Sequence, residues 1–189
     1  MDDVRLVLAS ASPRRRELLA LTGIPFVVDA PEVDETCALG ARAAVVELSR
    51  RKALAAAAKH PGQVVLASDT LVAIDDAPLG KPRDEADALR MLTALQGRHH
   101  TVCTGVTVRQ GQRMLTRAQS TQVWFRSAST EELKAYIRSG EPMDKAGAYG
   151  VQGLGALLVE RIDGDFFNVM GLPVLLLSRM LAEFGVTLL

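Results

Sequence analysis

Residues 6–23 read LVLASASPRRRELLALTG, an apolar run followed by a turn of serines and proline and then by three consecutive arginines. The run from Val4 to Ser10 is apolar and partly β-branched, which is typical of a strand buried on both faces. Ser12 suits the N-cap of a helix, Pro13 its first turn and Gly23 its end. The stretch therefore predicts a strand, a tight turn and a helix, a unit typical of α/β folds. The expected apolar stripe of this helix is Leu18, Leu19 and Leu21.

The rest of the chain continues with the same kinds of element. Periodicity and turn residues predict helices over 41–59, 84–95 and 129–138 and from Pro173, and strands over 63–74, 101–109 and 115–126. The last two strands are expected to form a hairpin, so the sheet is mixed. After the glycine-rich segment near residue 150 we expect a strand, a turn at 163–165 and another short strand. One α/β domain over residues 1–189 is the simplest interpretation, because no repeat or linker divides the chain.

Charge and composition argue against several classes of function. The chain has 22 basic and 22 acidic side chains, so nothing in its net charge favours nucleic acid or an acidic membrane as an obligate partner. Its aromatic content is only 4%, which is low for stacking on bases. Cys37 and Cys103 lack metal-site spacing, and no segment resembles a signal peptide or a membrane span. We expect a cytoplasmic protein without membrane contact.

The three arginines stand at the first turn of the predicted helix. Backbone N–H groups are unpaired there, the helix dipole is positive, and the small residues before it let an anion approach. Guanidinium groups add paired donors that fit phosphate oxygens. The alternative is a solvated basic turn whose arginines pair with carboxylates such as Glu17. The strand and the Ser-Pro cap before the arginines favour the phosphate site.

Asp69 interrupts an otherwise apolar strand. An ionised carboxylate there is costly unless it meets a cation, a metal or several donors. Alternatively, Asp69 and Thr70 could end the strand by bonding their own backbone. The acidic segment Glu32–Glu35 could supply a second carboxylate, and two carboxylates with phosphates suit Mg²⁺ or Mn²⁺, although such a loop can also simply be solvated.

Two lysines complete a set of charges. Lys52 lies in the predicted helix 41–59, and Lys81 stands between a turn and a proline. Together with the arginines and the carboxylates they suit a metal-bound polyphosphate, because cations meet its oxygens while carboxylates serve the metal and water. The glycines at 147–155 do not follow a strand in the dinucleotide-binding arrangement, so a Rossmann cofactor site is excluded.

Five segments resemble, in order, the motifs of the Maf family of nucleoside triphosphate pyrophosphatases. They are LASASPRRRELL at 8–19, PEVDET at 31–36, SDTLVAIDDAPLGKP at 68–82, LQGRHHTVCTGV at 95–106 and DKAGAYGVQGLGALLVERIDGDFFNVMGLP at 144–173. The resemblance implies an inosine-triphosphatase-like α/β fold, an elongated mixed β-sheet flanked by helices with a central cleft, in a homodimer. It also implies hydrolysis of a nucleoside triphosphate to the monophosphate and pyrophosphate, with a divalent metal cation, Mg²⁺ or Mn²⁺, as cofactor.

The resemblance also implies catalytic roles. Asp69 resembles the proton acceptor of the family, and Glu35 resembles the carboxylate that helps to hold the metal together with Asp69. Arg15, Lys52 and Lys81 match residues that contact phosphates or support turnover.

Other positions that match the family bear on substrate binding. Ser10 and Ser12 lie in the phosphate-binding turn with Arg14, which is also one of three positions that differ between branches of the family. The other two are Thr70 and Gln152, and this combination is similar to the branch that acts on dTTP and UTP. Thr70 and Gln152 could bond the carbonyl and imide N–H of a pyrimidine. Taken without the resemblance, Gln152 is a loop amide bonded to backbone.

Two alternatives stay open. One is a non-catalytic nucleotide- or nucleic-acid-binding regulator of cell division, as the older septum-formation name of the family suggests, although a pure binder has little use for a buried Asp69. The other is pyrophosphohydrolysis of modified pyrimidine nucleotides as nucleotide-pool house-cleaning.

Overall fold

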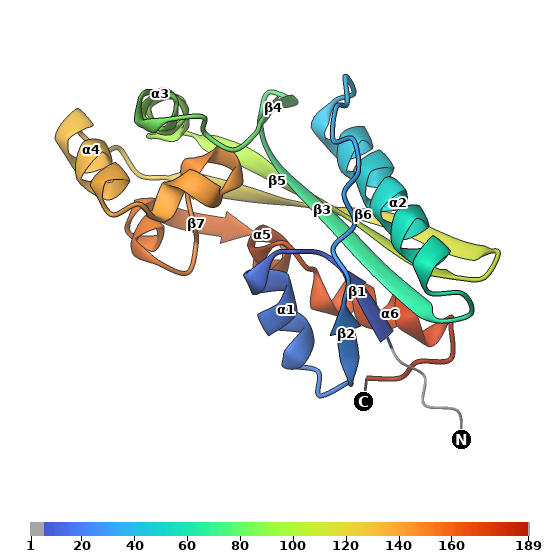
Figure 1. Cartoon of the computed structure of the whole chain (residues 1–189). Helices are drawn as coiled ribbons and strands as arrows, with labels where there is room; N and C mark the ends of the chain where they lie inside the picture. Colours follow the sequence, from blue (N-terminus) through green and yellow to red (C-terminus); the bar gives the residue numbers. More distant parts are fainter. Residues whose placement is uncertain (1–5, 189) are drawn as a thin grey trace.

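Within residues 6–188, which the computed structural model describes, seven strands form one mixed sheet (Figure 1). The strand order is β2-β1-β3-β5-β6-β7, and β4 pairs with β3 off this path. β1 is parallel to β2 and β3, and the other pairs are antiparallel. The predicted α/β class and the predicted hairpin, β5–β6, are confirmed. The strands are β1 (Leu6–Ala9), β2 (Phe26–Val28), β3 (Val64–Ile74), β4 (Ala77–Leu79), β5 (His99–Gln110), β6 (Arg113–Phe125) and β7 (Val159–Asp163).

Three of the predicted helices begin at a side-chain cap, whereas the helices that follow Gly40 and Pro173 have none. Ser12, Asp84 and Ser129 each accept a bond from a backbone N–H of the first turn, and Glu132 completes a capping box with Ser129. None of the helices in the described chain is both long and apolar enough to cross a membrane. The helices are α1 (Pro13–Ala20), α2 (Ala41–Lys59), α3 (Glu85–Leu95), α4 (Thr130–Arg138), α5 (Phe166–Met170) and α6 (Val174–Ala182), with 3-10 helices η1 (Glu141–Asp144), η2 (Ala146–Ala148) and η3 (Leu154–Leu158).

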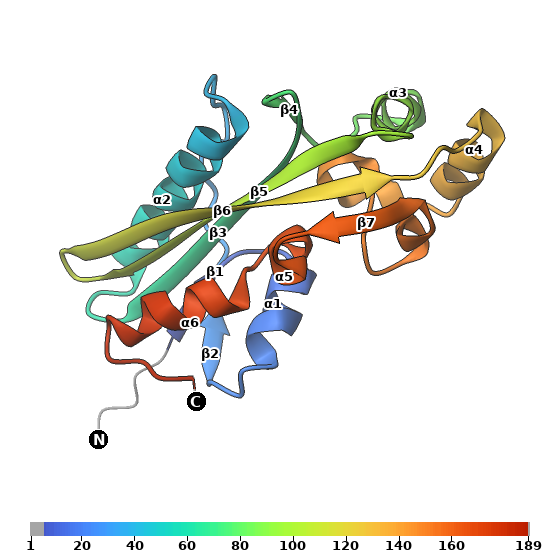
Figure 2. The same ribbon diagram turned by 180° about the vertical axis from the view of Figure 1, so that it is seen from behind.

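Helices cover both faces of the elongated sheet (Figures 1 and 2). α2 packs on one face, where Val65 of β3 meets Ala53. On the other face, Leu66 packs into a core shared with α1 and α6, and Val72, further along β3, packs into a second core shared with α3 and α4. Because successive side chains of a strand point to opposite faces, β3 contributes to both layers.

Four sequence-based expectations differ from the structure. The second short strand expected after the turn at 163–165 is instead helix α5, because the Asp165 carboxylate accepts bonds from the backbone N–H groups of Phe167 and Asn168 and caps a helix there. Leu21 is 75% exposed, so only Leu18 and Leu19 of the expected stripe are buried. β2 was not expected, and β4 stands where only a turn was predicted. The predicted start of the first strand, Val4, lies outside the described residues.

One edge of β3 is open in its middle. β1 pairs with Val64–Ala67 and β4 pairs with Val72–Ile74, whereas β5 pairs continuously along the other edge. The residues between β1 and β4, Ser68–Leu71, therefore border a gap at the carboxyl end of β1. Such a strand end, followed by a helix N-terminus, is a common place for ligands in α/β folds.

Candidate functional site

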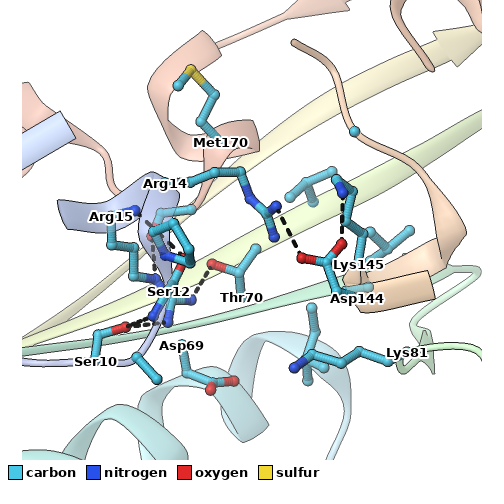
Figure 3. Close-up of a pocket in the computed structure, with 18 of the residues that line it drawn as sticks. Ser10, Ser12, Arg14, Arg15, Asp69, Thr70, Lys81, Asp144, Lys145 and Met170 are labelled. Carbon is cyan, nitrogen blue, oxygen red and sulfur yellow. Dashed lines mark hydrogen bonds and ion pairs between the residues drawn. The ribbon is translucent and has the colours of Figure 1, made fainter. Parts of the chain in front are cut away.

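A cleft of about 950 Å³ lies at this gap. It is bordered by the end of β1 and the start of α1 on one side, by α2 and the loop before it on another, and by the segment from η1 to residue 153 opposite. The structure brings all the site residues proposed from the sequence to this one cleft, and Figure 3 labels those at the end of β1, at the start of α1 and on β3 together with Lys81. The full set is Ser10, Ser12, Arg14, Arg15, Glu35, Lys52, Asp69, Thr70, Lys81 and Gln152.

Lys52 joins the two carboxylates on the α2 side of the cleft. Its Nζ lies 2.6 Å from Asp69 Oδ1 and 2.7 Å from Glu35 Oε1. The side chains of Lys52 and Asp69 are 13% and 10% exposed, whereas that of Glu35 is 65% exposed. The hydrogen bond from Lys52 is the main cause that lowers the pKa of Glu35, and the charge of Lys81 acts in the same direction. The cost of burying Asp69 is thus offset by a cation.

On the opposite face of β3, Arg15 forms hydrogen bonds at Thr70, the residue next to Asp69. Its Nε donates to Gly171 O (2.8 Å), and its two terminal nitrogens donate to Ser10 Oγ (3.3 Å) and Thr70 Oγ1 (2.9 Å). Burial lowers the pKa of Arg15, although the nearby charge of Asp69 opposes this effect. Arg15 therefore ties α1, β3 and the residue after α5 together, in addition to any contact with a ligand.

The hydroxyl of Thr70 belongs to a directed chain of hydrogen bonds. Thr104 Oγ1 donates to Asn168 O (3.0 Å), so in the 3.0 Å contact between the two threonine hydroxyls Thr70 is the donor. Thr70 Oγ1 also accepts from Arg15. A hydroxyl has one donor and two acceptor positions, so Thr70 keeps one acceptor position for a ligand.

The wall opposite contains charges that sequence reasoning missed. Asp144 lies 3.6 Å from Arg14 and 2.6 Å from Lys145, all three at the cleft (Figure 3). Asp144 and Lys145 begin the motif DKAGAYG quoted above. The sequence alone does not indicate that this charged pair lines the cleft, because its position depends on how the chain folds.

Glu141 holds the loop that carries Gln152. Its carboxylate accepts from the hydroxyl of Tyr136 (2.8 Å) and from the backbone N–H groups of Leu154 (2.8 Å) and Gly155 (3.1 Å). A Cβ at Gly153 would collide with this carboxylate. The glycines of this loop thus let backbone pass close to Glu141.

The carboxylates can hold a metal only with help from other ligands. No cluster of three or more His, Cys, Asp or Glu side chains that could bind a metal occurs within residues 6–188. Glu35 and Asp69 are two carboxylates of the cleft that share one ammonium group. Mg²⁺ is commonly held by one or two carboxylates together with phosphate oxygens and water, so this pair fits a metal that arrives with a polyphosphate.

Comparison with known proteins gives a consistent result over nearly the whole chain. The family described as Maf-like protein matches residues 5–184. The chain is 51% identical over 187 residues to a dTTP/UTP pyrophosphatase of Moorella thermoacetica, covering 96% of each chain. It is 49% identical over 183 residues to one of Symbiobacterium thermophilum, covering 96% of this chain and 94% of that one.

A solved structure supports the fold alone. The Staphylococcus aureus Ham1 protein superposes with a TM-score of 0.52 at 14% identity, covering 95% of this chain and 98% of that one. The agreement supports the elongated, inosine-triphosphatase-like α/β fold that the family resemblance implied.

Proposed function

The chain belongs to the Maf family, and from this premise we propose that it hydrolyses dTTP and UTP to the monophosphate and pyrophosphate. The observation that carries the proposal is the meeting of two carboxylates, Glu35 and Asp69, on one lysine inside a cleft lined by further cations. Relatives of nearly the same length that are called dTTP/UTP pyrophosphatases support the choice of substrate. Modified pyrimidine nucleotides are further candidates for the same pocket.

The triphosphate binds where the cations gather. The first turn of α1 carries Arg14 and the positive end of the helix dipole, and Lys52, Lys81 and Lys145 line the same cleft. These groups neutralise the phosphate oxygens and the charge that develops on the departing pyrophosphate.

Asp69 is the general base of the proposed reaction. It accepts a proton from a water whose oxygen bonds to the α-phosphorus, while the bond from that phosphorus to the bridging oxygen breaks and pyrophosphate leaves with the bonding electrons. Lys52 holds the Asp69 carboxylate in place through its 2.6 Å contact.

A divalent cation, Mg²⁺ or Mn²⁺, is part of the proposal, with Glu35 and Asp69 as its protein ligands. When bound it would neutralise phosphate charge. Lys52 lies against both carboxylates, so it keeps their oxygens together before any metal arrives.

Thr70 and Gln152 select the base. The one acceptor position left on Thr70 suits the imide N–H of uracil or thymine, which cytosine lacks at the same ring position. Gln152 adds an amide that can meet a pyrimidine carbonyl.

We further propose a homodimer that works in the cytoplasm, the compartment of the nucleotide pool. Light scattering on the purified protein should then give twice the chain mass of 20.3 kDa. A single chain mass at micromolar concentration would contradict the dimer.

The test is pyrophosphate release with Mg²⁺ or Mn²⁺ from dTTP, UTP, CTP, ATP, GTP and 7-methyl-GTP, alongside Asp69→Asn. We expect release from dTTP and UTP, lowered by about 10²–10⁴-fold in the variant, the usual contribution of a general base. Asp75→Asn, at an exposed carboxylate paired with Arg98, is the matched control. Nucleotide binding without release would replace this proposal with the regulatory alternative.

A further inference from the structure

The loop that carries Glu35 has little regular structure of its own. Residues 29–40, between β2 and α2, form neither helix nor strand. Within this loop, Thr36 N–H donates to Asp34 Oδ1 (2.8 Å), which closes a local turn but does not attach it to the rest of the fold. Glu35 is largely exposed, so packing does not fix its position either.

Arg51 attaches this loop to α2. One terminal nitrogen of its guanidinium donates to Asp34 O and to Thr36 O, both at 3.0 Å. These carbonyls belong to the residues immediately before and after Glu35. The Nε of Arg51 donates to Glu47 Oε1 at 2.9 Å, one turn earlier on the same helix, which fixes the direction of the guanidinium.

We propose that Arg51 is a positioning residue that holds Glu35 at Lys52 and Asp69. The proposal rests on the proposed function, because it assigns Arg51 a role in the same reaction. Arg51 and Lys52 are neighbours on α2, so one rigid helix fixes both the backbone on either side of Glu35 and the ammonium that Glu35 contacts. A displacement of about 1 Å at a catalytic group can cost about 10²-fold in rate, so this attachment matters for turnover although Arg51 lies outside the reacting groups.

The geometry requires a guanidinium. Arg51 contacts the loop carbonyls through one nitrogen and Glu47 through another, and a lysine has only a single nitrogen for both tasks. Arg51→Lys should therefore resemble Arg51→Gln, whereas a role of charge alone would leave the lysine variant active. Arg50→Gln is the matched control, because Arg50 is the adjacent residue on the same helix and makes only a 4.0 Å contact with Glu47.

The experiment is a double-mutant cycle on the full chain with dTTP and UTP, using Arg51→Gln, Glu35→Gln and the double variant. We expect Arg51→Gln to lower kcat roughly 10- to 100-fold, with an unchanged thermal midpoint relative to Arg50→Gln. In the Glu35→Gln background the same change should have an effect of less than about twofold, because Arg51 acts through Glu35.

A second readout does not depend on catalysis. Hydrogen–deuterium exchange of the peptide covering residues 30–40 should become faster in Arg51→Gln and Arg51→Lys but not in Arg50→Gln. Unchanged exchange, or losses that multiply in the double variant, would overturn the role of Arg51. A wild-type chain that releases no pyrophosphate would instead refute the proposed function, while the exchange data would still decide whether Arg51 holds the loop.

Discussion

Lys52 Nζ lies 2.6 Å from Asp69 Oδ1 and contacts Glu35 at nearly the same distance, so a single ammonium group organises the two carboxylates of the cleft. The three residues come from α2, β3 and the loop before α2. The hydrogen bond from Lys52 is the main cause that lowers the pKa of Glu35, so pH is the variable that reveals this contact.

Lys52→Met should lower turnover and raise the pH at which activity is lost in acid. The hydrogen bond from Lys52 is the largest cause of the lowered pKa of Glu35, so without it Glu35 takes up a proton at higher pH. The acidic limb of kcat/KM against pH should move upward. Lys59→Met is the control, because Lys59 lies on the same helix and pairs with Asp29 away from the cleft. An acidic limb that stays in place would argue against Glu35 as an essential carboxylate.

Thr104→Val tests the direction of the hydrogen bonds at Thr70. Valine cannot accept from Thr70, so the Thr70 hydroxyl becomes free to donate to a ring nitrogen that lacks a hydrogen. We expect the ratio of kcat/KM for UTP to that for CTP to fall roughly tenfold, about the value of one hydrogen bond.

The control for this change is Thr107→Val. Thr107 is a buried threonine on the same strand that contacts Ser49 and Thr116 but not the cleft. If both variants lower the UTP-to-CTP ratio of kcat/KM equally, general loosening of β5 explains the effect. Thr70 would then not select the base through its hydroxyl.

Glu141→Gln should weaken substrate binding more than it slows turnover. The carboxylate accepts hydrogen bonds from two backbone N–H groups of the loop that carries Gln152, and the amide of glutamine would place an N–H donor against them. The lost hydrogen bonding costs about 1–3 kcal/mol in the stability of this loop. We expect KM for UTP to rise roughly tenfold with a smaller change in kcat. Glu131→Gln, at an exposed carboxylate on α4, should leave both constants unchanged. A fall in kcat at constant KM would place Glu141 in the chemical step instead.

Local sequence patterns predicted most of the fold. The caps Ser12, Asp84 and Ser129 act within their own first turns, so they are readable without tertiary information. β2 was missed because it is three half-exposed residues held by parallel pairing with β1, a contact that no local pattern encodes. α5 was predicted as a strand because its five residues are too few for helical periodicity, and Asp165 decides the outcome.

The site was predictable where a residue is anomalous in its own segment. Asp69 stands out because its strand is apolar, and the arginines stand out because they follow a helix cap. Arg51 and Glu141 give no such signal, since a charged residue on a helix or in a loop is ordinary. The backbone groups that they bond lie elsewhere in the chain, and these contacts become visible only in the folded structure.

His100 should make the protein less stable in acid. It is buried, its Nε2 lies 2.8 Å from the hydroxyl of Tyr149, and burial is the main cause that lowers its pKa to about 3. Between the ordinary pKa of 6.5 and about 3 the unfolded chain therefore binds a proton that the folded chain does not. The free energy of unfolding falls as pH drops through this window, by up to about 1.4 kcal/mol per pH unit.

Urea unfolding at several pH values measures this effect. His100→Gln keeps an acceptor for Tyr149 but cannot titrate, so its stability should depend less on pH between 6.5 and about 3. His99→Gln, at the exposed neighbouring ring whose charge also lowers the pKa of His100, should change the pH dependence less than His100→Gln does. Equal pH dependence in wild type and His100→Gln would show that His100 is not buried in its neutral form.

Gly105→Ala should lower both the stability of the fold and the rate of turnover. Gly105 is paired with Asp69 in the β3–β5 register, and a Cβ there would collide with the backbone carbonyl of Val45 on α2. Because backbone cannot yield as a flexible side chain does, α2 must move away from the sheet, and Lys52 moves with it. We expect a loss of about 1–3 kcal/mol in the free energy of unfolding, measured in urea, together with a fall in kcat. Gly80→Ala, where a Cβ meets no atom within 4 Å, is the control for stability. Lost stability with unchanged kcat would mean that the distance between Lys52 and Asp69 does not depend on the close approach of α2 to β5.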